Sequence, residues 1–206
     1  MKRVLVLLMV AVLATVSQAV LIDSFVNADF DYGIVTTPGP FKGFDAPAAP
    51  EIDGWVNYGT INDAGVEASG AWWIVGYAYQ NCAFVNVGGG ASNMSGYTIQ
   101  DGDQFTASFI GDGWGGTSAR VSLWYDDPAN VFGSFDTVMD AWFFAPHSNA
   151  TLIDATQAAV GGTLGVTIEN LGDNYLGFDE MTVNVVPEPA TLALLGLGGL
   201  LIRRKK

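Results

Sequence analysis

The chain has 206 residues, half of them hydrophobic, and a formal net charge of −13. Six of its eight basic residues lie near the two ends, so residues 20–186 contain 2 basic and 20 acidic side chains, a net charge of −18. A body this acidic repels phosphate backbones, which argues against nucleic acid as a partner. The 12 Phe, 7 Tyr and 6 Trp residues exclude a disordered chain and predict a folded body.

Residues 1–19 contain the three parts of a secretory signal peptide in the right order. Lys2 and Arg3 form the positive region, residues 4–16 are apolar apart from Thr15, and small residues stand at the −3 and −1 positions before the site after Ala19. The apolar run is shorter than the roughly 20 residues that span a bilayer. We therefore expect engagement by the secretion machinery and cleavage after Ala19, rather than a membrane anchor.

Residues 20–186 are predicted to form one all-β domain. Alternation of apolar and polar residues, the pattern of strands with one buried face, recurs at residues 105–109, 121–125, 164–169 and 181–185. Glycine-rich and Asn/Asp-rich turns separate these segments. Many short strands joined by such turns favour a sandwich, and we predict a jelly-roll β-sandwich.

Five segments of this body follow one another in an order that resembles galactose-binding-like jelly rolls, the fold of many carbohydrate-binding modules. They are residues 26–31, 53–55, 97–106, 164–170 and 177–183. The resemblance implies a structural calcium ion held by Asp31 and Asp179, although the family usually has Glu at the position of Asp31. Calcium takes six to eight oxygen ligands, with carbonyls completing the shell. The alternative is that both carboxylates cap turns, and no other cofactor is expected.

Aromatic side chains are the best candidates for a binding site, because sugars stack their apolar faces on exposed rings. Trp114 lies in a glycine-rich loop, and one of Trp72 and Trp73 is expected to face outward. We select Trp73 and Trp114 as candidate carbohydrate-binding residues; the alternative for each single Trp is burial in the core. Trp124 falls on the strand face opposite Leu123, and Trp55 and Trp142 are expected in the core.

Catalytic residues are scarce. The single Cys82 and single His147 are too few for a zinc site, and we expect a buried thiol and an exposed loop histidine. The adjacent carboxylates Asp126-Asp127 and Asp179-Glu180 are expected to point to opposite faces of a strand, so neither pair makes a glycosidase site by itself. The body is therefore predicted to be non-catalytic.

Residues 187–206 have the layout of a membrane-processing signal. Pro187, Glu188 and Pro189 precede an uncharged run at 190–202, and the chain ends in Arg203, Arg204, Lys205 and Lys206. As a helix the run would be about 20 Å long, short of a hydrocarbon core of about 30 Å. The four cations resist translocation, so they are expected to stop transfer and hold this hydrophobic helix in the membrane until it is processed.

This layout resembles the PEP-CTERM sorting domain of Gram-negative-type bacteria. The resemblance implies that Pro187, Glu188 and Pro189 are recognised by an exosortase, a membrane cysteine protease or transpeptidase that accompanies exopolysaccharide production. The alternative is a plain C-terminal anchor. Together with the export signal, the PEP-CTERM resemblance predicts a cell-surface or extracellular-matrix protein. Three hypotheses remain for the body: a polysaccharide-binding module, a structural matrix protein without a defined ligand, or a hydrolase or lyase.

Overall fold

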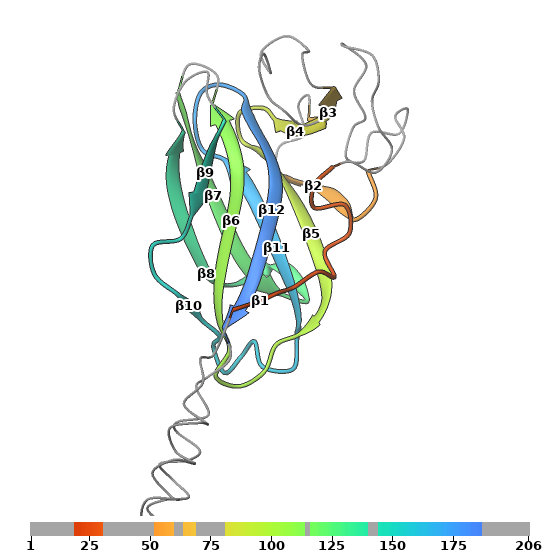
Figure 1. Ribbon diagram of the computed structural model, residues 1–206, viewed down its shortest axis with the longest axis vertical. Coiled ribbons are helices and arrows are strands. Elements are labelled where there is room, and N and C mark those ends of the chain that lie inside the picture. The colour runs from red at the N-terminus through yellow and green to blue at the C-terminus, as the bar shows by residue number, and fades with distance from the viewer. Residues whose placement is uncertain are drawn as a thin grey trace, which may run out of the picture.

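The computed structural model describes residues 19–30, 52–59, 64–68, 81–113, 116–139 and 144–186. These residues form twelve strands and no helix, arranged as two antiparallel sheets packed face to face (Figure 1). The predicted jelly-roll β-sandwich is confirmed. Several predictions concern parts of the chain outside the described residues: the signal peptide before Ala19, Asp31, Trp73, Trp114, Trp142 and everything after Val186.

The first sheet has seven strands, of which five follow the order β10-β6-β12-β4-β3. β1 adds to β12 and β9 adds to β6. The strands are β1 (Val20–Leu21), β3 (Gly65–Ala68), β4 (Asn81–Val85), β6 (Gln104–Gly113), β9 (Ala145–Ser148), β10 (Ile153–Asp154) and β12 (Leu176–Val186).

The second sheet has five strands in the order β2-β5-β11-β7-β8. Its members are β2 (Trp55–Gly59), β5 (Gly89–Thr98), β7 (Thr117–Tyr125), β8 (Asp127–Met139) and β11 (Thr163–Asn170). β11 is the central strand, and it pairs with β5 on one side and β7 on the other. The inner faces of the long strands build the core between the sheets. The outer face of this second sheet carries the site described below.

The core follows the alternation in the sequence. Leu164, Val166 and Ile168 on β11 are completely buried, as are Phe105 and Ala107 on β6. Each lies on the face of its sheet that meets the other sheet, so period-two patterning located the core correctly.

An aromatic cluster closes one part of this core. The rings of Phe30, Trp55 and Phe178 pack with centroid separations of 5.0, 5.3 and 5.9 Å. The indole N–H of Trp55 donates a hydrogen bond to the carbonyl of Asn27 at 2.9 Å, which satisfies its one polar group. Trp55 is therefore a core residue, as predicted, and it ties the N-terminal segment to both sheets.

Cys82 is buried, as predicted. The expectation of an exposed loop for His147 is wrong, because His147 is half-buried on a strand. His147 lies on β9 and pairs with Phe109 of β6, and its ring stacks on the Phe109 ring at 5.2 Å. Its Nδ1 is 3.0 Å from the hydroxyl of Thr137 on β8. The segment expected to be a loop is the short strand β9, which pairs with β6 of the first sheet. Through the His147–Thr137 contact it is also connected to β8 of the second sheet.

The two ends of the body lie side by side. β1 runs antiparallel to the end of β12, with Val20 opposite Val185 and Leu21 opposite Asn184 (Figure 1). The backbone N–H of Ile22 extends this contact by donating to the carbonyl of Val183 at 2.9 Å. The first residues after Ala19 are thus neighbours of the last residues before Pro187.

Candidate functional site

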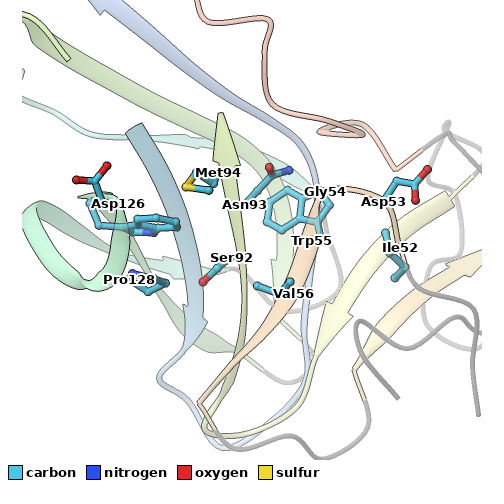
Figure 2. Close-up of a pocket in the computed structure, with 11 residues that line it drawn as sticks. Ile52, Asp53, Gly54, Trp55, Val56, Ser92, Asn93, Met94, Asp126 and Pro128 are labelled. Atoms are coloured by element: carbon cyan, nitrogen blue, oxygen red, sulfur yellow. The ribbon is translucent and has the colours of Figure 1, made fainter. Parts of the chain in front are cut away.

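A groove of about 550 Å³ lies on the outer face of the second sheet. Three parts of the chain line it: residues 52–56 at the start of β2, residues 92–94 in β5, and Trp124, Asp126 and Pro128 around the turn from β7 to β8 (Figure 2). Since β2 and β7 are separated by β5 and β11 in the sheet, the groove crosses the strands.

Trp124 forms the floor of this groove. Because Leu123 points into the core, the next residue on β7 points outward. Its indole ring lies across β11 at Gly165: a Cβ atom at that position would come within 2.3 Å of the ring carbons, so only glycine leaves room for the ring. Trp124 is 3% exposed and is therefore a fixed part of the floor rather than a free ring.

A chain of hydroxyl groups fixes the ring in place. The indole N–H of Trp124 donates to the Thr167 hydroxyl at 2.8 Å, and that hydroxyl lies 2.7 Å from the hydroxyl of Ser92. The three residues stand on three adjacent strands, β7, β11 and β5. All three are at most 3% exposed, so the network satisfies polar groups that would otherwise be buried without partners.

Two exposed apolar side chains stand beside this floor. Val56 on β2 is 53% exposed and lies opposite Ser92 in the sheet register, and Met94 on β5 is 52% exposed and lies opposite Gly165. Single exposed apolar residues are ordinary, but two on neighbouring strands at the edge of one groove form a surface that a ligand can cover.

Carboxylates mark the two ends of the groove. Asp53 precedes β2 and Asp126 follows β7, and Figure 2 shows them at opposite ends of the lining residues. Asp126 has a φ of 59°, and two hydrogen bonds to the backbone of Thr163 hold it there: its N–H donates at 2.9 Å and its Oδ1 accepts at 2.8 Å. One end of the groove is thus rigidly built, and both carboxylates are exposed.

No positive charge balances these carboxylates within the described part of the groove. Arg120 is the sole basic side chain among all the described residues, and its guanidinium binds Asp136 through two hydrogen bonds of 2.8 and 2.9 Å. This hydrogen bonding lowers the pKa of Asp136 and raises that of Arg120. The described lining of the groove therefore carries two carboxylates and no Lys or Arg.

Trp73 and Trp114, the residues selected from the sequence, lie outside the described residues, so their role stays a prediction. Trp124 was placed correctly on the outer strand face but was not selected. Its partners Gly165 and Thr167 are more than 40 positions away, and no local pattern signals that they lie beneath it.

Asp179, the other predicted calcium ligand, is buried within β12, and its Oδ1 accepts a hydrogen bond from the N–H of Glu180 at 2.7 Å. Glu180 has a φ of 52°, and the pairing of β12 with β6 shifts register here, so Asp179 supports a β-bulge. Within the described ranges, no group of three or more His, Cys, Asp or Glu side chains could hold a metal ion. Of the two expected calcium ligands only Asp179 is described, so calcium binding stays a prediction.

Similarity to solved structures supports the fold. The Stig cyclase Fisc from Fischerella sp. TAU superposes with a TM-score of 0.62 at 18% identity, over 82% of this chain and 99% of that one. The enzymatically active domain of tailspike protein 4 from bacteriophage CBA120 gives a TM-score of 0.51 at 13% identity, over 80% and 22% of the chains. At these identities the likeness concerns the sandwich alone.

A third structure, the CBM22-1 xylan-binding domain of Xyn10C from Paenibacillus barcinonensis, has a TM-score of 0.48 at 11% identity, over 74% of this chain and 99% of that one. This weaker likeness carries no argument about the present chain. No curated protein matches the sequence significantly.

The C-terminal end gives the decisive match. Residues 185–206 match the PEP-CTERM protein-sorting motif. The chain carries a PEP-CTERM sorting signal. This signal implies processing by an exosortase, export, and a location at the cell surface or outside the cell. The PEP-CTERM match starts at Val185, inside β12, so the matched residues overlap the folded body by two positions.

Among the described residues, no helix has the length and apolarity needed to cross a membrane.

Proposed function

We propose that this PEP-CTERM protein is an exported surface or matrix protein whose β-sandwich binds carbohydrate, without catalysis, in the groove of the second sheet. One observation carries the proposal: an open groove that combines an apolar surface with carboxylates at its two ends. Its volume of about 550 Å³ falls within the usual range for ligand sites, about 300–1,000 Å³.

The chemistry of the groove suits a sugar chain. Pyranose rings offer C–H faces and a rim of hydroxyl groups. Val56 and Met94 supply apolar surface for the C–H faces, and Trp124 gives a rigid floor. The carboxylates of Asp53 and Asp126 are acceptors for sugar hydroxyls, and hydrogen bonds to charged acceptors are stronger than neutral ones.

Charge narrows the class of polysaccharide to neutral chains. The groove carries carboxylates and no described cation, and residues 20–186 have a net charge of −18. A polymer of uronic acids or sulfated sugars would meet like charge along its whole length, which costs binding energy and slows association.

The described groove residues also favour binding over reaction. They include no histidine or cysteine, and the Ser92 hydroxyl is bound to the Thr167 hydroxyl rather than to a base. A glycosidase instead needs two carboxyl groups that face each other across the scissile bond, about 5–9.5 Å apart. Asp53 and Asp126 stand at opposite ends of the groove, with β5 and β11 between them (Figure 2). Incubation of the purified protein with polysaccharides, with reducing ends as the readout, tests this part, and release of sugar would contradict it.

A glycan array that contains neutral and acidic polysaccharides tests the binding itself. The protein purified from the extracellular fraction should retain neutral chains. Met94→Ala and Val56→Ala should each weaken retention about fivefold to tenfold, because each removes apolar contact area. Val138→Ala is the matched control, since Val138 is 76% exposed on β8 and does not line the groove.

Binding to no glycan, or equal losses in all three variants, would overturn the carbohydrate proposal. The structural alternative, an acidic matrix protein without a defined ligand, would then account for the exported body and its charge of −18.

A further inference from the structure

The match to the sorting motif begins inside the folded body. The PEP-CTERM match starts at Val185, the last residue but one of β12. Val185 is paired on both sides, with Phe105 of β6 and with Val20 of β1, and its side chain is 5% exposed. The residues that open the signal are therefore held in the middle of a sheet.

An enzyme can bind Val185 and Val186 as part of this signal only where their backbone is accessible as an extended peptide. Extended peptides bind through their backbone N–H and C=O groups and through alternate side chains. In β12 those backbone groups face strands on both edges, and the Val185 side chain is in the core. Val185 is thus inaccessible to an enzyme as long as β12 keeps both neighbours.

The two neighbours hold β12 unequally. β6 pairs with β12 over most of its length, from Leu176 to Val186. β1 has two residues, Val20 and Leu21, and both are more than half exposed. Short strands at chain ends, with little buried surface, open at small free-energy cost compared with the rest of a domain.

We propose that β1 is a latch over the sorting signal, and that the exosortase binds the chain after β1 has separated from β12 and Val185 and Val186 have left the sheet. The contact between Val20 and Val185 makes the start of the mature chain a control element for processing at its other end. This inference rests on the expected cleavage after Ala19 and on processing of the sorting signal by an exosortase, and it is independent of carbohydrate binding.

A disulfide across the latch tests it. In the full chain, expressed in a host with an exosortase, Leu21→Cys with Asn184→Cys places two cysteines at opposed register positions. Opposed residues in antiparallel strands have Cα atoms about 4.5–5.5 Å apart, within the range that a disulfide spans. The cross-linked chain should be cut at its C-terminus at least about tenfold more slowly than either single variant, which corresponds to about 1.4 kcal/mol.

The matched control joins β7 to β8 through Ser118→Cys with Val138→Cys, also opposed in register. This cross-link stiffens the sandwich away from the signal and should leave processing unchanged. Rates are measured by pulse-chase and mass shift on chains whose N-terminal signal has been removed, so slow export does not enter the comparison.

A spacer variant separates the latch from a general effect on folding. A Gly-Ser insertion of about six residues between Val186 and Pro187 lets the motif move about 13 Å on average, and at most about 20 Å, from the sheet. It should restore processing of the chain cross-linked at residues 21 and 184. Processing of the cross-linked chain at the unaltered rate, or no rescue by the spacer, would overturn the latch. If the unaltered chain is never cut at its C-terminus, the exosortase route itself fails.

Discussion

The indole N–H of Trp124 donates a hydrogen bond to the hydroxyl of Thr167, 2.8 Å away on the neighbouring strand. Thr167 also lies 2.7 Å from the hydroxyl of Ser92, so one threonine links the floor of the groove to two other strands. The shape of the groove therefore depends on a residue that does not line it.

Thr167→Val should destabilise the protein by about 1–3 kcal/mol, because it leaves the buried indole N–H and the Ser92 hydroxyl without this partner. Urea denaturation followed by circular dichroism measures the change. Thr182→Val is the matched control: Thr182 and Ser108 form a similar hydroxyl pair at 2.6 Å on the other sheet, without an indole. If Thr182→Val lowers the free energy of unfolding as much as Thr167→Val does, the hydrogen bond to Trp124 has no special role.

Gly165→Ala should be destabilising by about 1–3 kcal/mol, because the added methyl group would overlap the Trp124 ring and force it to move. Glycan retention should fall with it, since the floor of the groove is displaced. Gly96→Ala is the control, because the nearest atom to an added Cβ there is the Ser24 Cβ, at 3.6 Å. Unchanged stability of Gly165→Ala would contradict this prediction, because it would show that the Trp124 ring can accommodate the added methyl group.

The protein should lose stability in alkali through Tyr97. Burial raises the pKa of Tyr97, and the hydrogen bond from its hydroxyl to Asp103, 2.8 Å long, raises it further. In the unfolded chain a tyrosine ionises near pH 10. The contribution of Tyr97 is thus fully present below about pH 10 and is lost as the pH rises toward the folded pKa.

Tyr97→Phe should therefore be less stable than the parent at pH 7, by about 1 kcal/mol for the lost hydrogen bond. The difference should shrink above pH 10, because the variant has no phenol to ionise at this position. Urea titrations from pH 7 to 11 compare the two proteins, and the remaining tyrosines titrate in both. Parallel stability curves over that range would contradict the assignment to Tyr97.

If Asp31 and Asp179 bind calcium, adding calcium to the metal-stripped protein should raise its Tm. The expected rise is about 4 °C or more at a free calcium concentration of 100 times Kd. Asp31→Asn should abolish that rise and leave the stability of the stripped protein nearly unchanged. Asp23→Asn is the control, since Asp23 is exposed. Equal melting curves with and without calcium would favour the turn-capping role for Asp179, whose Oδ1 already accepts the N–H of Glu180.

The fold was predictable because strand periodicity is local. The alternation at residues 164–169 is enough to assign Val166 to the core, whatever strand lies next to it. The groove is a property of register between strands distant in sequence. Gly165 lies opposite both Trp124 and Met94, and neither pairing leaves a mark in the sequence around these residues. The same reason explains the error at His147, whose strand partner Phe109 comes 38 positions earlier.

The sheet that contains β12 and the sheet that contains the groove are opposite layers of the sandwich. A chain tethered through the end of β12 would therefore keep its groove on the flank turned away from the tethering layer. A long polymer could run across that flank, perpendicular to the strands, without meeting the attachment point. The domain could thus be held at the cell surface through the end of β12 and bind a polysaccharide chain in its groove at the same time.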